Sequence, residues 1–301
     1  MTLNITHEIT SPASPSRGTL VFIHGWPDDA SLWAGQVPRM VEEGYRCVCV
    51  TLPGFGPRQK DSDPGGVHHR AHSFVAVADA LARLIREEIA PGDGEQVILV
   101  CHDWGSYYGF YLENLYPQLV CKMIVMDVGP PLFGRRPSWK TVPLLFVVGL
   151  IYQYWLILAW LLARCLPWCG IGRALGDGLA RLVARVTGVP KVRRDAGGVT
   201  ARCCYPYWVM HRNAWLELLG LKKPDGTRPA SRAAVPRCPC LFFWGSGKGF
   251  RFHTRAWERA LLARTDGSKV VALERAKHWL MLDCREEVNN LMAAWLAGEE
   301  G

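Results

Sequence analysis

The sequence predicts an α/β fold in which a mostly parallel central sheet is flanked by helices and carries an inserted helical cap. Short apolar, β-branched-rich runs alternate with helical patterns over the first 130 residues and again after residue 230, as expected when crossover helices join parallel strands. Between these two parts the alternation stops, and helical patterns rich in Trp and Tyr take over. At 301 residues and 49% hydrophobic composition, the chain can bury one large core with an insertion.

Six apolar runs have the length and composition of buried strands. They are Thr19–Ile23, Arg46–Thr51, Val97–Cys101, Cys121–Met126, Cys240–Trp244 and Lys269–Leu273. Five other segments show the apolar periodicity of helices. These are Leu32–Glu43, Phe74–Ile89, Ser106–Tyr116, Thr254–Ala263 and Arg285–Leu296. The core is therefore predicted from residues 1–130 and 231–301, and the helical cap (a lid) from residues 131–230.

One stretch of the cap, residues 142–163, has no charged residue and the length of a membrane-spanning helix, roughly 20 residues. Pro143, Gly149 and Gln153 interrupt it, and a span there would separate the later strands from the earlier ones. We therefore expect insertion helices that are apolar on most faces. A soluble lid is favoured, a lid that also contacts a membrane surface is the second choice, and a true span is the third.

The composition narrows the range of partners. The net charge of +8 and the pI of about 9.0 come from scattered Lys and Arg without a nucleic-acid motif, so nucleic acid is not expected as a partner. The amino terminus lacks the pattern of a secretory signal. We expect an intracellular protein, cytoplasmic or membrane-associated, whose eleven cysteines are thiols.

No metal site is expected. The cysteines show no paired CxxC units at zinc spacing. His68, His69 and His72 form a cluster, but no acid or Cys is positioned to complete a site, and solvent exposure is the favoured interpretation.

Residues 101–105, CHDWG, carry the first chemical signal. Small residues flank Asp103 by two positions at a predicted strand-to-helix junction, which is the spacing of a nucleophile elbow. The helix that follows presents its amides to negative charge. The alternative is an aspartate that only caps the helix.

Two further segments occur in the order that a hydrolase needs. HGWP at residues 24–27 directly follows the first predicted core strand, where the backbone N–H of Trp26, with that of Trp104, could form an oxyanion hole. His278 follows the last predicted strand, where a general base is expected. Without that context, His278 would be interpreted as an ordinary surface histidine.

Together, HGWP, the HDWG elbow, the helical cap and the late His278 resemble the α/β-hydrolase superfamily, and in particular its epoxide hydrolases. The likeness covers nearly the whole chain. It implies an α/β-hydrolase fold, an Asp nucleophile at position 103 and no cofactor.

The acid that should orient His278 departs from the epoxide-hydrolase pattern. No Asp or Glu occurs between Asp225 and Glu258, where that family usually places it. We expect Asp127 to replace it, because some haloalkane and fluoroacetate dehalogenases of the superfamily carry an acid after the corresponding strand. Asp127 lies 24 residues after Asp103. The alternative role for Asp127 is that of a turn former.

The resemblance also implies proton donors from the cap, because the oxygen of an opening epoxide leaves as an alkoxide. Tyr152 stands in the Tyr-Gln context of one donor, with Tyr154 as the close alternative. His211 occupies the place of the second Tyr, or else only packs in an aromatic cap. The remaining substrate-binding residues are expected to be His24, Tyr154 and Trp155.

The expected function is hydrolysis of a small hydrophobic, lipid-like epoxide to a vicinal diol through a covalent ester on Asp103. A carboxylate nucleophile argues against ester substrates, since its attack would produce an anhydride. Dehalogenation of a haloalkane or haloacid by the same nucleophile is the second hypothesis. A non-catalytic ligand-binding protein is the third.

Overall fold

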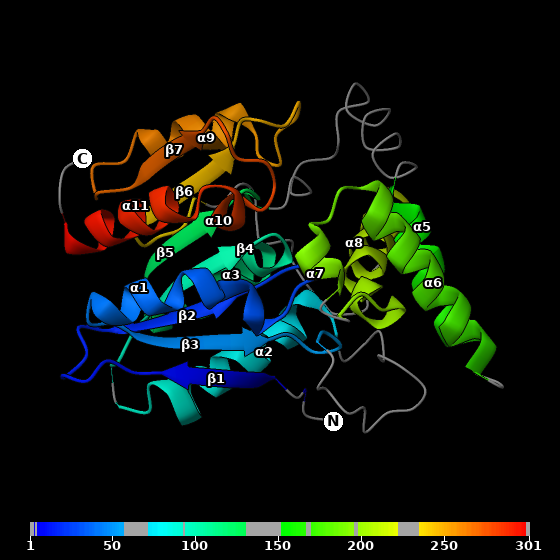
Figure 1. The fold of residues 1–301 in the computed structure, drawn as a ribbon, viewed down its shortest axis with the longest axis horizontal. Helices are drawn as coiled ribbons and strands as arrows, with labels where there is room; N and C mark the ends of the chain where they lie inside the picture. The colour runs from blue at the N-terminus through cyan, green and yellow to red at the C-terminus, as the bar shows by residue number, and fades with distance from the viewer. Residues whose placement is uncertain are drawn as a thin grey trace.

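The computed structural model describes residues 3, 5–56, 72–92, 94–130, 152–166, 170–195, 198–221 and 235–298. Its centre is a seven-stranded sheet in the order β1-β3-β2-β4-β5-β6-β7 (Figure 1). Every neighbouring pair is parallel except β1 and β3, which are antiparallel. The predicted α/β architecture with a mostly parallel sheet is confirmed.

All six predicted strands form, each within one residue of its expected ends. They are β2 (Thr19–Ile23), β3 (Arg46–Thr51), β4 (Val97–His102), β5 (Val120–Met126), β6 (Cys240–Gly245) and β7 (Lys269–Leu273). β4 and β6 are buried at every position, which explains their uninterrupted apolar sequences. The sequence did not predict β1 (Thr6–Thr10), an edge strand whose residues are mostly exposed and therefore lack an apolar pattern.

The helices of the core follow the predictions with one clear exception. The single helix expected over Leu32–Glu43 is two: η1 (Ala30–Gly35) and α1 (Val37–Glu42). Pro38, near the start of α1, has no N–H to continue the hydrogen bonding of η1. The prediction of one continuous helix was therefore wrong. The other core helices are α2 (Phe74–Leu84) with its π-helical extension η2 (Ile85–Ile89), α3 (Trp104–Leu115), η3 (Pro117–Leu119), α9 (Arg255–Leu262), α10 (Leu280–Asp283) and α11 (Arg285–Ala297).

Between β5 and β6, the described residues are all helices and loops. The helices are α5 (Tyr154–Cys165), α6 (Ile171–Val186), α7 (Lys191–Asp195), η6 (Ala201–Cys204) and α8 (Tyr205–Leu218). They lie together at one end of the sheet, beyond the carboxyl end of β4 (Figure 1). The expected cap boundaries, residues 131 and 230, lie outside the described residues, as do residues 142–151 of the apolar stretch.

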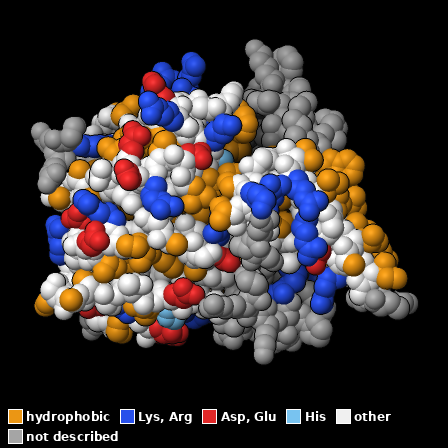
Figure 2. All heavy atoms as spheres, in the orientation of Figure 1, with side chains coloured by type: hydrophobic (Ala, Val, Ile, Leu, Met, Phe, Trp, Pro, Cys, Tyr) orange, Lys and Arg blue, Asp and Glu red, His pale blue; other side chains and the backbone are white. Residues whose placement is uncertain are grey.

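On the face that Figure 2 shows, charged side chains of both signs are interspersed with apolar ones over the α/β part, and apolar side chains run along the outer edge of the cap beside a row of Lys and Arg. No described helix is long and apolar enough to cross a bilayer. The ten cysteines in the described part of the chain are free.

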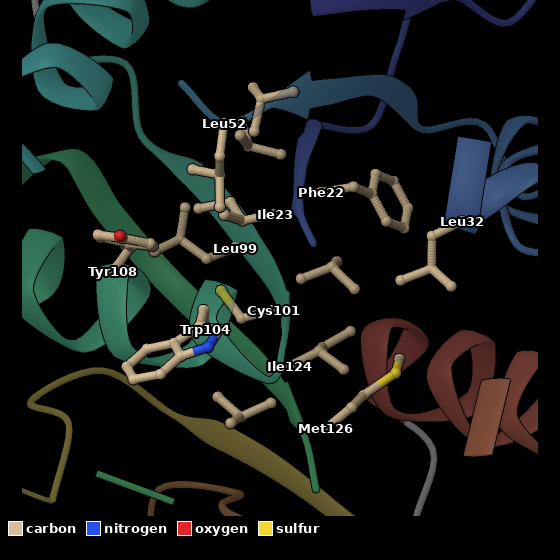
Figure 3. Close-up of a cluster of buried hydrophobic side chains, with 14 of the residues drawn as sticks. Phe22, Ile23, Leu32, Leu52, Leu99, Cys101, Trp104, Tyr108, Ile124 and Met126 are labelled. Atoms are coloured by element: carbon tan, nitrogen blue, oxygen red, sulfur yellow. The ribbon is translucent and has the colours of Figure 1, made fainter. Parts of the chain in front are cut away.

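The core of the sheet lies directly beneath the predicted elbow. Cys101 and Ile124 come from the adjacent strands β4 and β5, and they lie near Trp104 at the start of α3 (Figure 3). All three side chains are at most 4% exposed. Tight packing at this point fixes where β4 ends and thus where Asp103 lies.

Candidate active site

Asp103 occupies a sharp turn between β4 and α3. Its backbone has φ 52° and ψ −120°, a conformation that is strained for a non-glycine residue and is found at functional turns. The turn requires neighbours without side chains, since a Cβ on Gly105 would overlap the carbonyl oxygen of Ile23, and one on Gly25 would overlap Asp103. The small-residue spacing in the sequence therefore has its expected steric cause.

The carboxylate of Asp103 lies against the loop after β2. The backbone N–H of Trp26 donates to Asp103 Oδ2 at 2.8 Å, and the backbone N–H of Trp104 also bonds to this carboxylate. Burial raises the pKa of Asp103 to about 6, although His278 and the two N–H groups act in the opposite direction. The two N–H donors predicted for an oxyanion hole thus converge on one carboxylate.

His278 lies between Asp103 and Asp127. Its Nε2 is 3.8 Å from Asp103 Oδ1, and its Nδ1 is 2.6 Å from Asp127 Oδ2. A proton on Nδ1 donated to Asp127 leaves Nε2 able to accept one on the side of Asp103. Burial lowers the pKa of His278, but the hydrogen bond and charge of Asp127 outweigh it, and the pKa is raised overall.

Asp127 ends β5 and is fully buried. It also has a positive φ, 69°, which aims its carboxylate back across the end of the sheet. Its Oδ1 accepts the backbone N–H of Gly245 at 3.2 Å and the ammonium of Lys248. Burial raises the pKa of Asp127, yet His278 and Lys248 outweigh burial and hold it below its ordinary value.

Lys248 was missed by sequence reasoning. Its side chain is 7% exposed, and it follows β6 in the segment where the resemblance led us to look for an acid. Burial lowers the pKa of Lys248, and the charge of Asp127 partly restores it. In the segment where the acid was first sought, the chain thus carries the cation Lys248, which binds Asp127 from the neighbouring strand β5.

Two buried histidines support the site from behind. His102 Nε2–H donates to the backbone carbonyl of His278 at 2.9 Å, which ties the base to the residue before the nucleophile. His24 Nδ1–H donates to the carbonyl of Gly25 at 2.9 Å, and the N–H of Leu52 donates to His24 Nε2 at 3.0 Å. His24 is 0% exposed, and both of its ring nitrogens are hydrogen-bonded within the protein; its contact with substrate stays a prediction.

Tyr152 and His211 belong to one hydrogen-bonded chain. Burial lowers the pKa of His211 to about 4, so at neutral pH its single N–H, on Nε2, donates to Gln153 Oε1 at 2.7 Å. Gln153 Nε2 donates in turn to the hydroxyl of Tyr152 at 3.1 Å. Burial, together with the nearby charge of Asp103, raises the pKa of Tyr152 to about 12. Of the two expected donors, Tyr152 is the one whose pKa is influenced by the charge of Asp103.

Tyr207 of α8 packs against two aromatic residues of the site. Its ring packs edge-on against Trp104 at a centroid distance of 4.9 Å and against Tyr152 at 5.8 Å. Burial and then the charges of Tyr152 and Asp103 raise its pKa. Among the other expected residues, Tyr154 packs on the ring of His211, and Trp155 is 49% exposed.

A buried ion pair connects the cap to the loops that carry Trp26 and His278. Arg193 of α7 donates from Nε to Asp28 Oδ1 at 2.5 Å, and the indole N–H of Trp279 donates to Asp28 Oδ2 at 2.9 Å. Asp28 lies two residues after Trp26, and Trp279 directly follows His278. The position of α7 is therefore coupled to the oxyanion loop and to the base.

No group of three or more metal-ligating residues occurs within the described part of the chain. His68 and His69 of the histidine cluster lie outside it, and the ring of His72 packs against Tyr205. The geometry supports a nucleophilic carboxylate, a base held by a second carboxylate, two backbone N–H donors and a phenol. These groups suffice for covalent hydrolysis at a carbon atom.

Known proteins resemble the chain at several levels. An epoxide hydrolase (srdG) of Neurospora crassa is 32% identical over 102 residues, which are 34% of this chain and 28% of that protein. A fluoroacetate dehalogenase of a Burkholderia species is 32% identical over 115 residues, 38% of this chain and 36% of that protein. These alignments span about a third of the length of the curated relatives.

The structure of epoxide hydrolase A from Mycobacterium thermoresistibile superposes with a TM-score of 0.67 and 20% identity, covering 98% of this chain and 96% of that one. At this identity the superposition supports the fold alone. Residues 20–291 match the alpha/beta hydrolase family, a range that includes the elbow, the oxyanion loop and His278. Since this match spans most of the sequence, the chain belongs to the alpha/beta hydrolase family.

Proposed function

We propose that this protein is an epoxide hydrolase that opens an apolar epoxide through an ester on Asp103. The observation that carries the proposal is the carboxylate at the nucleophile elbow, held by the N–H groups of Trp26 and Trp104 and facing His278. A carboxylate nucleophile suits attack on a saturated carbon. The similarity to epoxide hydrolases in sequence and in fold supports the same choice.

In the first step, Asp103 Oδ1 attacks an epoxide carbon, and the bond from that carbon to the ring oxygen breaks. Tyr152 donates a hydrogen bond and then its proton to the departing oxygen. The hydroxyl of Tyr152 already accepts from Gln153, so its own proton is available for the substrate. We assign His211 a positioning role through Gln153, and Tyr207 the place of the second phenol over Asp103.

In the second step, His278 Nε2 removes a proton from water, and the oxygen of that water attacks the carbonyl carbon of the Asp103 ester. The N–H groups of Trp26 and Trp104 stabilise the oxyanion. Collapse breaks the ester bond, and the proton held by His278 restores the neutral alcohol of the departing vicinal diol. The proton left on the regenerated Asp103 carboxyl returns to the Tyr152 phenolate, which restores the starting state. Asp127 stabilises the imidazolium that forms between these events.

A dehalogenase is the second candidate. The indole N–H groups of Trp26 and Trp104 are buried, and their neighbours are the Cys204 thiol and the Tyr207 hydroxyl respectively. Two such N–H groups suit a departing halide. The similarity to a fluoroacetate dehalogenase and the position of Asp127 after β5 favour the same reading.

A turnover panel tests the proposal. Purified protein is incubated with aliphatic and aryl epoxides, with alkyl halides and haloacids, and with aryl esters, and the products are measured by mass spectrometry. Diol from at least one apolar epoxide, abolished by Asp103→Ala, is the expected result. Halide release without diol formation would replace the proposal with the dehalogenase, and ester turnover that survives Asp103→Ala would refute both.

A further inference from the structure

The outer face of α5 carries exposed apolar side chains. Trp155 and Leu158 lie in the first half of α5, and Leu166 directly follows its last residue; they are 49%, 39% and 48% exposed. Trp155 and Leu158 are three residues apart, which places them on one side of the helix. Helices of water-soluble proteins normally expose polar residues on this side.

α6 carries a second exposed apolar stripe. Ile171, Leu175, Leu182 and Val186 are 60%, 53%, 54% and 75% exposed. Their spacing of four, seven and four residues confines them to a narrow arc of the helix. The packed face of α6, formed by its buried residues, is a separate arc.

The two stripes lie on the same side of the helix pair. Added Cβ atoms at Gly172 and Gly176 would overlap the carbonyl oxygens of Leu162 and Ala159 respectively, so the helices are antiparallel with their backbones in close contact. On each helix the exposed arc borders the arc that faces its partner. The stripes therefore join into one surface, the hairpin face, and apolar atoms run along α5 and α6 at the edge of the molecule (Figure 2).

The hairpin face consists of seven exposed apolar residues: Trp155, Leu158, Leu166, Ile171, Leu175, Leu182 and Val186. Contiguous exposed patches of large apolar side chains mark interaction sites.

The charge beside the hairpin face is positive. Arg181 and Arg185 are exposed on α6, and their spacing places them on the flank of the apolar stripe. The acidic residue of these two helices is Asp177, whose side chain is 17% exposed and is bonded to the backbone N–H of Ala201 and to Arg181. An apolar stripe bordered by arginines is the pattern of helices that lie in the interface of a membrane.

We propose that the hairpin face docks on an anionic lipid surface, with its apolar residues among the acyl chains and its arginines at the headgroups. A second copy of the chain fits less well, because a two-fold contact would bring the arginine rows of both copies together. Lipid phosphates and carboxylates complement those rows. Docking of this kind needs no spanning helix and does not depend on which reaction Asp103 carries out.

The test is flotation of the full chain with vesicles of phosphatidylcholine mixed with phosphatidylserine, compared with pure phosphatidylcholine. Binding to the mixed vesicles, weakened by salt, is expected. Leu175→Gln with Leu182→Gln should lower the partition coefficient by about 30-fold, because two large apolar side chains no longer enter the lipid. Arg181→Gln with Arg185→Gln should lower it by about 25-fold on the mixed vesicles alone.

Leu262→Gln is the matched control, since Leu262 is 55% exposed on α9, outside the hairpin face, and should bind like the unaltered protein. Circular dichroism confirms that each variant is folded. Absence of binding, equal binding to both kinds of vesicle, or an equal loss in the control would overturn the proposal. It is also overturned if the unaltered chain dimerises in sedimentation and the Leu175/Leu182 variant only abolishes that dimer.

Discussion

The carboxyl ends of β4 and β5 lie side by side and each presents an aspartate with positive φ, but the two carboxylates have opposite surroundings. Asp103 after β4 is held by backbone N–H groups, and burial raises its pKa to about 6. Asp127 after β5 is held by His278 and by the buried ammonium of Lys248, and its pKa is lowered. The same local geometry thus holds one carboxylate whose pKa is raised toward neutral pH and one whose pKa is lowered.

This difference shows how one sheet edge can supply two roles for one residue type. A nucleophile must be able to lose its solvation and give its electrons to a substrate, whereas an orienting acid must stay ionised throughout the cycle. In this account, the neutral N–H donors leave the carboxylate of Asp103 able to react. The cationic partners of Asp127 keep its carboxylate ionised and unreactive.

Removing the orienting charge has the largest expected effect. Asp127→Asn should slow diol release by about 10³–10⁴-fold, because His278 loses the partner that fixes its tautomer and stabilises its cation. Formation of the Asp103 ester should remain within about tenfold of normal, since the first step does not use the base. Rapid-quench measurements separate the two steps, and an equal loss in both would contradict the division of roles.

The two aspartates should also differ in sign when stability is measured. Above about pH 6 the ionised form of Asp103 destabilises the folded state, because its pKa is raised on folding, so Asp103→Asn should stabilise the protein by about 1–3 kcal/mol. Asp127→Asn should destabilise it by a similar amount, since its lowered pKa stabilises the fold at all pH values above its ordinary range. Urea unfolding at pH 7.5 measures both, and the same sign for the two variants would break the contrast.

The pH dependence of the first step isolates the nucleophile. Since Asp103 attacks only when ionised and its pKa is about 6, the rate of ester formation should fall about tenfold per pH unit below 6 and level off above it. Asp127 adds no limb in this range, because its pKa is lowered. Rapid-quench measurement of ester formation in the unaltered protein gives this profile with His278 in place, which is required because His278 lowers the pKa of both aspartates. A flat profile down to pH 4.5 would contradict the raised pKa.

A smaller effect is expected at the cation that distinguishes the two carboxylates. Lys248 lowers the pKa of His278 through its charge, so Lys248→Met should raise that pKa and move the midpoint of ester hydrolysis to higher pH. Below the midpoint the rate should drop by about threefold to tenfold. Lys248→Arg keeps the charge and is the control. An unmoved midpoint in Lys248→Met would show that Lys248 only fills space.

The sequence predicted those parts of the fold that depend on burial. Strands with continuous apolar runs, such as Val97–His102, were found because both of their faces are covered. The exposed edge strand Thr6–Thr10 left no pattern to find. The break between η1 and α1 comes from Pro38, whose effect on helix continuity is local. The amphipathic period continues on both sides of Pro38, and the sequence therefore predicted a single helix.

The parts of the site that need small residues for close backbone contact could be predicted from the spacing of residues in the sequence. The elbow at Asp103 and the loop at Trp26 require small neighbours at fixed positions, and these residues can be recognised in the sequence. The contact of Lys248 with Asp127 could not be predicted, because a lysine among glycines has the sequence pattern of a surface loop. Only the fold buries Lys248 against Asp127. His211 was expected to donate to the epoxide oxygen, but the structure directs its N–H to Gln153. Residue spacing in the sequence does not specify that contact.

The central claim is that Asp103 is the nucleophile, and intact-protein mass spectrometry of His278→Gln tests it most directly. Without its base the enzyme should stall after the first step. Incubation with an apolar epoxide should then add the full mass of the epoxide, and peptide mapping should place the addition on Asp103. An epoxide that the unaltered protein converts to diol, but that leaves no adduct on Asp103 in this variant, would contradict the account.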